Sequence, residues 1–194
     1  LVAEGKRLQE RKTMIKIPTG SFAGNIKKMY LVRLLYNTFF ISAVLVPFYT
    51  DWGRIKFSQI LFLNAWFMFW NFLLEIPTGT IADFLGRKVS IVLGCIVGAV
   101  GGIVYASYPH YAVFLLGEII FSLSYTLLSG ADEALAYDSL KEIDRTHLSK
   151  KVFSRMESFK LAGIVIGATA GGFIARYLGL RWPLLLQSIP LTAA

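Results

Sequence analysis

The sequence predicts an all-α membrane protein, built from hydrophobic helices that follow one another closely along the chain. Of its 194 residues, 55% are hydrophobic and only 16% are charged, whereas a soluble domain carries about 25% charge. The mean hydropathy is +0.57. The apolar residues gather in long runs with almost no charge, and most lysines and arginines lie in the gaps between them. This pattern is typical of helices that span a lipid bilayer.

The helices are expected where apolar runs reach the roughly 20 residues that cross a bilayer. Strands of a membrane barrel would instead alternate polar and apolar residues over about ten positions, which these runs do not do. A sixth run begins near Pro183 and is cut off at Ala194, so we expect the sequence to be a fragment. The five complete runs are residues 29–49, 57–82, 89–108, 111–137 and 159–178.

The distribution of basic residues predicts which helix ends face the cytoplasm. Short connections make neighbouring helices antiparallel, so the gaps alternate between the two sides. Fifteen of the 20 lysines and arginines then lie on one side, four lie on the other, and Arg33 lies within the first run. Because cytoplasmic loops are rich in Lys and Arg, we predict a cytoplasmic basic segment at 1–28 and a six-helix domain at 29–194. A cytoplasmic loop at 138–158 is expected as an amphipathic surface helix or as a solvated loop.

Several kinds of site are excluded by the residues that the chain lacks. Cys95 is the only cysteine, so it forms no internal disulfide, and no metal-ligand cluster surrounds it. His110 and His147 lie in opposite loops and no nucleophile–base pair is evident, so we expect no enzyme, no cofactor and no metal. The membrane explains the net charge of +8 better than nucleic acid does, since no basic face is interleaved with aromatic residues.

Polar residues recur on one face of three predicted helices. On the second and fourth helices they follow one another at steps of three and four residues, which is one helical face. An ionised residue in mid-membrane costs about 2.5–3.5 kcal/mol on insertion scales, so these stripes must face the bundle interior or a watery cavity. We interpret them as a cavity for solute or protons, with structural ion pairing as the alternative. The cavity residues are Arg33, Asn37, Asn64, Asn71, Glu75, Glu118, Ser122, Tyr125, Ser129 and Asp132.

One ion pair is hypothesised within this set. Glu75 lies about 12 Å from Asp83 along the second helix, at 1.5 Å per residue. Arg33 lies at a comparable cytoplasmic depth on the antiparallel first helix. We therefore hypothesise that Glu75 and Arg33 form an ion pair.

Glycines recur at every fourth residue on the third and fifth helices. Small residues of this kind let helix backbones approach closely in membranes, where lipid removes the hydrophobic drive for association. The stripes serve packing alone, or they also form a smooth surface on which helices slide. The packing residues are Gly94, Gly98, Gly102, Gly163, Gly167, Gly171 and Gly172.

The turn between the second and third helices reads GTIADFLGRK at residues 79–88. It resembles the cytoplasmic signature of the major facilitator superfamily, Gly-x-Leu-Ala-Asp-Arg-x-Gly-Arg-Arg/Lys, and it follows the second helix as in that family. Ile81 replaces leucine, and Phe84 replaces the first arginine. The resemblance covers about residues 29–194.

This turn carries the predicted gating motif. In the family it acts as a latch that favours the outward-open state by gripping the opposite half of the protein. Its glycines permit a tight turn, and Asp83 is placed to accept hydrogen bonds at a helix end. Arg87 is placed to pair with Asp83 and Asp138. The gating residues are Gly79, Asp83, Gly86, Arg87, Lys88 and Asp138.

Weaker similarities to the family concern the direction of transport and its coupling to protons. Residues 163–172 resemble the family's antiporter motif, with Ala168 where proline is usual, which favours export. Glu118 stands near the position where the fourth helix usually carries an arginine linked to proton coupling. Residues 129–138 are similar to bacterial and archaeal members, including drug-efflux proteins.

The resemblance implies half of a twelve-helix transporter. Each half is a six-transmembrane-helix bundle of two inverted three-helix repeats, here with a cytoplasmic N-terminus. The implied function is a secondary active transporter, a multi-pass protein of the cell membrane that moves a small solute by alternating access, with proton-coupled export. Its partners would be lipid, the solute, protons and a second six-helix half, from the same chain or a homodimer, but no nucleic acid. The alternative is a non-transporting or half-size relative with an assembly or regulatory role.

Overall fold

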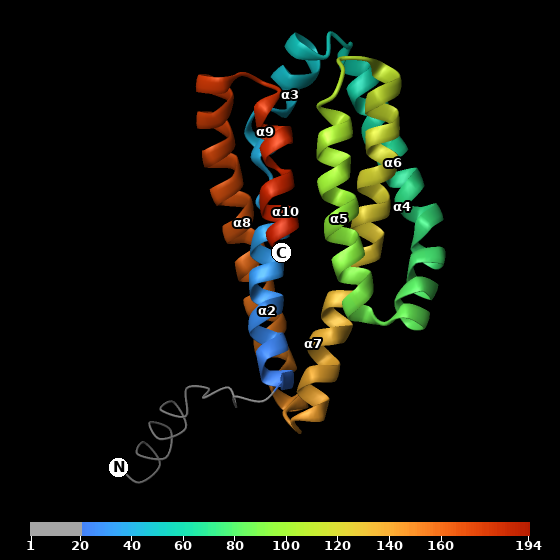
Figure 1. Cartoon of the computed structure of the whole chain (residues 1–194), viewed down its shortest axis with the longest axis vertical. Coiled ribbons are helices and arrows are strands. Elements are labelled where there is room, and N and C mark those ends of the chain that lie inside the picture. The colour runs from blue at the N-terminus through green and yellow to red at the C-terminus, as the bar shows by residue number, and fades with distance from the viewer. Residues whose placement is uncertain (1–20) are drawn as a thin grey trace.

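A computed structural model describes residues 21–194, in which every regular element is helical (Figure 1). Residues 1–20 of the predicted basic segment lie outside the described residues. The elements in chain order are α2 (Ser21–Tyr36), η1 (Phe40–Ala43), α3 (Leu45–Pro47), η2 (Phe48–Trp52), α4 (Phe57–Leu85), α5 (Arg87–Tyr105), α6 (Tyr111–Leu128), α7 (Ala131–Glu142), η3 (Thr146–Leu148), α8 (Ser149–Leu178), α9 (Trp182–Leu186) and α10 (Ser188–Ala193).

Four helical stretches in the described part of the chain are long and apolar enough to cross a membrane. They are Phe57–Leu85, Arg87–Tyr105, Tyr111–Glu142 and Thr146–Leu178. A fifth results if Gly24–Ala43 and Leu45–Trp52, which are bent by 63° relative to each other, count as one broken span. The predicted sixth run is helical as α9 and α10, but both are short. The described chain is therefore all-helical, as the apolar runs predict, with four or five candidate spans where six were expected.

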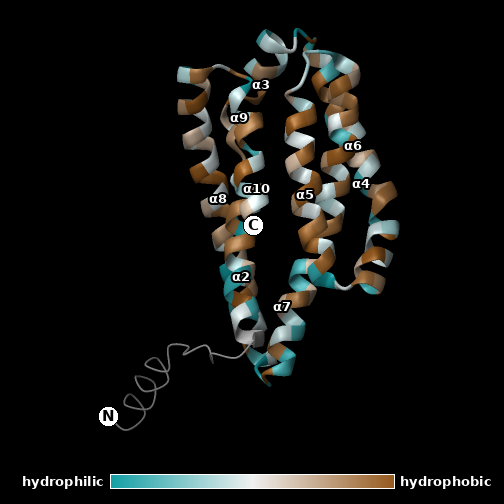
Figure 2. Cartoon of the chain, viewed as in Figure 1, coloured by the Kyte–Doolittle hydropathy of each residue, from teal (hydrophilic) through white to brown (hydrophobic). Residues whose placement is uncertain are grey.

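The outer faces of the long helices are apolar. Figure 2 shows hydrophobic residues along α5, α6 and α8, while hydrophilic residues gather near the lower end of α7. On α4, Phe72 is 78% exposed and Ile76 is 80% exposed. Contiguous apolar surface of this extent is unfavourable in water. Lipid removes that penalty, which agrees with a membrane location.

Helices distant in sequence pack against each other around two buried clusters. α4 and α5 pack against α6, α2 packs along α8, and α10 packs against α5 (Figure 1). One cluster joins α2, α5, the end of α6, α7, α8 and α10. The other joins η1, η2, α4, α5, α6 and α9. The second cluster forms one wall of the site described below.

The first span is broken, unlike the continuous helix expected for residues 29–49. α2 begins at Ser21 and ends at Tyr36, and the chain leaves the helix before η1. Asn37 Nδ2 donates to the Arg33 carbonyl at 2.8 Å, and Thr38 Oγ1 donates to the Leu34 carbonyl at 2.7 Å. Hydrogen bonds from side chains to the backbone compete with the hydrogen bonds of the helix. The adjacent polar residues Asn37 and Thr38 therefore favour the break here.

The glycine stripe of α8 lies against this break. A Cβ added at Gly167 would lie 2.5 Å from the Phe39 backbone nitrogen. One added at Gly171 would collide with the Phe40 carbonyl oxygen, and Gly163 is equally close to the end of α2. Backbone atoms cannot rotate away as a side chain does, so only glycine permits this approach.

The stripe of α5 packs against α6 and α9. Gly94 lies against the carbonyl of Ser124, Gly98 lies against the hydroxyl of the same serine, and Gly102 lies against the backbone of α9. Ser124 Oγ donates to the Gly94 carbonyl at 2.7 Å, which ties α6 to α5. Gly172, by contrast, has open space around it and does not belong to a close contact.

The fourth span and the segment after it differ from the expected layout. The helix is interrupted at Ser129 and Gly130, whose φ of +76° favours glycine. α7 then runs to Glu142, and α8 already begins at Ser149. Residues 138–158 are therefore mostly the ends of two long helices, rather than a separate surface helix or a solvated loop.

Candidate functional site

The central feature is an aromatic cavity of about 230 Å³. Its walls come from the broken first span, α4, α5, α6 and α9, so no single stretch of sequence forms it. Most of the lining is apolar or aromatic, with few polar groups. The polar and tyrosine residues of the lining are Tyr36, Tyr49, Asn64, Tyr105, Glu118, Tyr125 and Gln187.

Glu118 supplies the carboxylate of this cavity. Tyr105 Oη donates to Glu118 Oε1 at 2.8 Å, and Tyr49 Oη donates to the same oxygen at 3.2 Å. The two tyrosine hydroxyls also lie within hydrogen-bond distance of each other. Because each hydroxyl carries one proton, only two of these three hydrogen bonds form at a time. Phe114 stacks on Tyr105 with ring centroids 5.2 Å apart and is fully buried. The carboxylate is thus held by two donors inside an aromatic wall.

The adjacent glycine explains how this arrangement fits. A Cβ added at Gly117 would collide with the ring of Tyr105. Gly117 therefore lets the tyrosine lie flat on α6, from where its hydroxyl reaches Glu118. The position of the donor thus depends on a contact between α5 and α6.

The predicted polar stripe of α4 is divided between environments. Asn64 lines the aromatic cavity, and its amide donates to the Ile60 carbonyl at 3.3 Å. Asn71 is half-buried, and its Oδ1 has no partner among the described residues. Glu75 is exposed. Of these three residues, only Asn64 reaches the cavity.

The stripe of α6 and α7 is divided in a similar way. Glu118 and Tyr125 line the aromatic cavity. Ser122 is fully buried, and its hydroxyl donates to the Phe67 carbonyl at 3.0 Å, so it joins α6 to α4. Ser129 and Asp132 line a second, more polar hollow of about 370 Å³. Tyr125 lines both spaces and lies between them.

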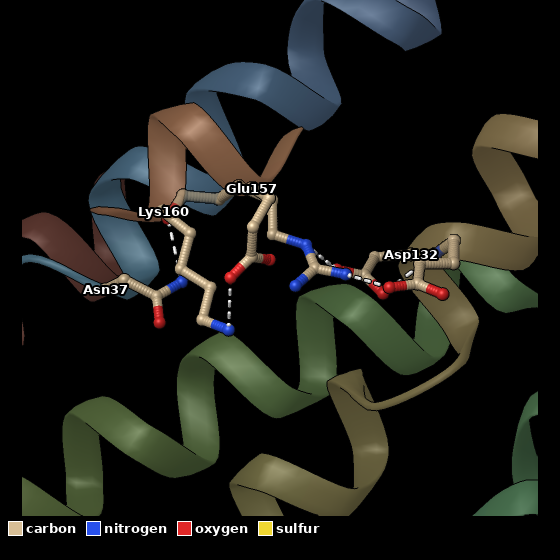
Figure 3. A network of polar contacts seen from close by, with 6 residues as sticks. Asn37, Asp132, Glu157 and Lys160 are labelled. Carbon is tan, nitrogen blue, oxygen red and sulfur yellow. Dashed lines mark hydrogen bonds and ion pairs between the residues drawn. The ribbon is translucent and has the colours of Figure 1, made fainter. Parts of the chain in front are cut away.

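The polar hollow is held by an ion-pair network (Figure 3). The guanidinium of Arg33 pairs with Asp132, which is 2% exposed, and with Glu133 at 3.0 Å. Lys160 pairs with Glu157 one turn apart on α8, at 2.9 Å. Asn37 also lines this hollow and lies at the Lys160 end of the network in Figure 3.

The hypothesised pair of Glu75 with Arg33 is wrong. Arg33 points toward α7, where Asp132 and Glu133 engage it. Glu75 has no ion pair within residues 21–194 and lies on an exposed face of α4. Equal depth in the membrane does not place two residues on facing sides of their helices.

The turn between α4 and α5 is shorter than the signature implies. α4 extends to Leu85, α5 begins at Arg87, and only Gly86, with φ +93°, lies between them. Arg87 forms an ion pair with Asp138 on α7. Asp83 therefore belongs to the last turn of α4 instead of capping a helix, and it forms no ion pair in the described chain.

The remaining gating residues surround this pair. Asp83, Gly86, Arg87, Lys88 and Asp138 together line an open hollow of about 460 Å³. Gly79 lies one helical turn earlier, with open space around it, so it makes no close contact here.

Seven polar or tyrosine residues of the two spaces were not predicted from the sequence. They are Tyr36, Tyr49, Tyr105, Glu133, Glu157, Lys160 and Gln187. Tyr49 and Tyr105 lie at the ends of apolar runs, where aromatic residues commonly mark the membrane interface. Glu133 lies off the polar stripe, next to Asp132. Gln187 could have been recognised as a candidate site residue, because it is an uncharged polar residue inside the last apolar run.

No cluster of three or more His, Cys, Asp or Glu residues that could hold a metal exists within residues 21–194. Buried Cys95 lies in the packed core away from both spaces. The chemistry that the described site offers is therefore hydrogen bonding, charge and aromatic contact.

Comparison with known proteins finds a distant similarity over half of the chain. No family model matches the chain. The quinolone resistance protein NorA of Staphylococcus aureus strain Mu50 is 30% identical over 97 residues, and that of strain MRSA252 is 29% identical over the same length. The matched segment is 50% of this chain and 24% of the relative, so the chain spans only part of the relative's length. With the apolar helices, this distant similarity indicates a multi-pass membrane protein.

Proposed function

We propose that the protein is a secondary active transporter of the major facilitator superfamily that exports a small solute by alternating access and couples export to protons. The observation that carries the proposal is the carboxylate of Glu118, held by two tyrosine hydroxyls inside an aromatic cavity. The similarity to the quinolone resistance protein NorA over half of the chain also supports export. A carboxylate within a membrane span is costly, and such residues mark ion and substrate pathways.

The proposed role of Glu118 follows from charge. When ionised, the carboxylate accepts hydrogen bonds from Tyr49 and Tyr105, and a cationic solute in the cavity neutralises it further. When protonated, it has no charge to attract a cation. Proton and cationic solute therefore compete for the same oxygen atoms, and this competition couples the movement of one to the opposite movement of the other.

The cytoplasmic side would provide the gate. The pair of Arg87 with Asp138 lies at the turn between α4 and α5, and the network of Arg33 with Asp132 lies deeper, at the polar hollow. In the proposal, a second six-helix half covers the exposed face of α4 and contacts the turn. The N-terminus is cytoplasmic, and the protein resides in the cell membrane.

A transport assay tests the proposal directly. Cells that express the intact protein are loaded with ethidium, a fluorescent cation, and its retention is followed with and without a protonophore. We expect lower retention than in cells without the protein, and the difference should vanish when the proton gradient collapses. Unchanged retention across a broad panel of cationic and neutral solutes would favour the alternative, a non-transporting protein with an assembly or regulatory role.

A further inference from the structure

The helices α2 and α8 pack side by side and run in the same direction, both beginning at the lower end of the molecule in Figure 1. Near that end, Tyr30 of α2 stacks on Phe159 of α8 with ring centroids 5.3 Å apart. One turn further along both helices, Gly163 lies against the backbone of Leu34. The contacts advance in step along the two helices, so residues before this aromatic pair also lie at matching levels.

Three basic residues lie at these levels, on one flank of the helix contact. Lys27 lies about one turn before Tyr30 on α2, and Arg155 and Lys151 lie one and two turns before Phe159 on α8. Successive residues rotate by about 100° around a helix axis, which places all three cations on the same side of the contact. The guanidinium of Arg155 also lies beside the Tyr30 hydroxyl. We call Lys27, Lys151 and Arg155 the basic flank.

The charge of the basic flank is not balanced by nearby acids. Its three side chains are exposed and form no ion pair within residues 21–194. α2 contains no acidic residue. Glu157, the one acidic residue of α8, lies on the opposite flank, where it pairs with Lys160 at the polar hollow. The basic flank therefore attracts an anion.

The surface directly beyond the basic flank is apolar. Leu31 lies one turn after Lys27 and is 51% exposed, and Phe159 is 40% exposed. Further along the same side of α8, Ile166 is 51% exposed. An anionic phospholipid has the matching order of groups, since its phosphate lies at the membrane interface and its acyl chains lie deeper. A soluble anion has nothing to cover the apolar part.

We propose that the basic flank binds the headgroup of an anionic phospholipid. The planar guanidinium of Arg155 suits phosphate, to which it can donate two parallel hydrogen bonds. Lys27 and Lys151 add positive charge from the two sides, and the acyl chains cover Leu31 and Phe159. None of these residues lines the aromatic cavity or the polar hollow, so the lipid site is separate from the proposed solute pathway and does not depend on transport.

Three probes separate the lipid from other anions. Phosphatidylglycerol and phosphatidylcholine with the same acyl chains differ in headgroup charge alone among the properties that matter here. Glycerol 3-phosphate carries the phosphate without acyl chains. Binding of each probe to the purified intact protein is measured by native mass spectrometry, which counts the bound molecules and gives a dissociation constant.

Two triple variants test the charges of the basic flank. Lys27→Gln with Lys151→Gln and Arg155→Gln removes all three. Lys27→Arg with Lys151→Arg and Arg155→Lys keeps every charge but changes the side chains. If charge attracts the headgroup, the first variant loses binding and the second retains it.

A matched control removes three other charges from the same end of the molecule. Lys28→Gln, Lys141→Gln and Lys150→Gln change the net charge by the same amount, and all three lysines are exposed. By the rotation of 100° per residue, Lys28 and Lys150 lie on other faces of α2 and α8, and Lys141 lies on α7. The control therefore separates this one flank from the total charge of the end.

We expect the charge-removing variant to bind phosphatidylglycerol about tenfold or more weakly, with phosphatidylcholine binding changed less than twofold. The charge-keeping variant and the control should bind both lipids like the unmodified protein. An equal loss in the control would assign the attraction to total charge and overturn the inference. Loss of both lipids by the charge-removing variant would also overturn it and assign these residues to folding. Tighter binding of glycerol 3-phosphate than of phosphatidylglycerol would identify a soluble phosphate as the ligand instead.

Discussion

Two adjacent carboxylates engage the same guanidinium in very different environments. Asp132 is 2% exposed, whereas the side chain of Glu133 is 60% exposed, and both pair with Arg33. A buried charge that loses its partner is destabilising by about 3–5 kcal/mol. An exposed pair contributes only about 0–1 kcal/mol because water screens it. Burial, not proximity, should therefore decide the effect of removing each charge.

The test compares Asp132→Asn with Glu133→Gln, two substitutions that remove one charge and keep the shape. For Asp132→Asn we expect a loss of about 2–4 kcal/mol of unfolding free energy, about 1 kcal/mol below the range for a fully broken buried pair, because Glu133 still engages Arg33. For Glu133→Gln we expect less than about 1 kcal/mol. The free energy of unfolding is measured by denaturant titration of the purified protein in detergent, followed by tryptophan fluorescence.

A double variant completes this experiment. Replacing both Arg33 and Asp132 by apolar residues of similar volume removes the buried charges together, which is often neutral or stabilising. We expect Arg33→Met with Asp132→Leu to recover most of the stability that either single charge removal loses. If Asp132→Asn and Glu133→Gln had equal effects, the reasoning from burial would be refuted.

Three further predictions concern helix packing, proton coupling and the turn between α4 and α5. Gly171→Ala should destabilise the protein by about 1–3 kcal/mol through overpacking against the first-span backbone, while the neighbouring Gly172→Ala, with open space, should be neutral or stabilising; equal thermal unfolding midpoints would contradict this. Glu118→Gln should abolish the protonophore-sensitive part of ethidium efflux at unchanged protein level, and retention of that part would exclude this carboxylate from coupling. Arg87→Asp and Asp138→Arg should each reduce efflux and the combined reversal should restore it, since the two residues form an ion pair; a double variant no better than the singles would show that the pair does not act as a unit.

Several features of the fold could be predicted because they depend on neighbours along the chain. A run of apolar residues is hydrophobic in any arrangement, so the long helices were located from composition alone. Gly86 and Gly179 end α4 and α8 with positive φ angles, which is the conformation that glycine favours. The glycine stripe of α8 could likewise be recognised from its spacing. Its partner, the broken backbone of the first span, could not.

The candidate site was predicted only in part. Glu118 was singled out because a carboxylate in an apolar run is rare, and it lines the cavity. Its two donors, Tyr49 and Tyr105, are distant in sequence and belong to types that are common at membrane interfaces. Arg33 was expected to pair with Glu75, yet Asp132 and Glu133 engage it. Depth can be counted from sequence, but the rotation of a helix about its axis depends on what it packs against.

The sequence by itself determined that the described chain is helical, where its long apolar spans lie, and which residues are rare enough in lipid to require a role. These properties depend on the free energy of transferring each side chain from water to an apolar environment. That free energy belongs to the residue itself and adds up along a run. Only the tertiary structure decided that the first span breaks after Tyr36, that Gln187 reaches Phe40, and that Glu118 lies between two tyrosines. Those contacts form only when helices far apart in sequence approach closely. Many helix arrangements would have similar hydrophobicity, and the packing of whole helix surfaces selects one of them.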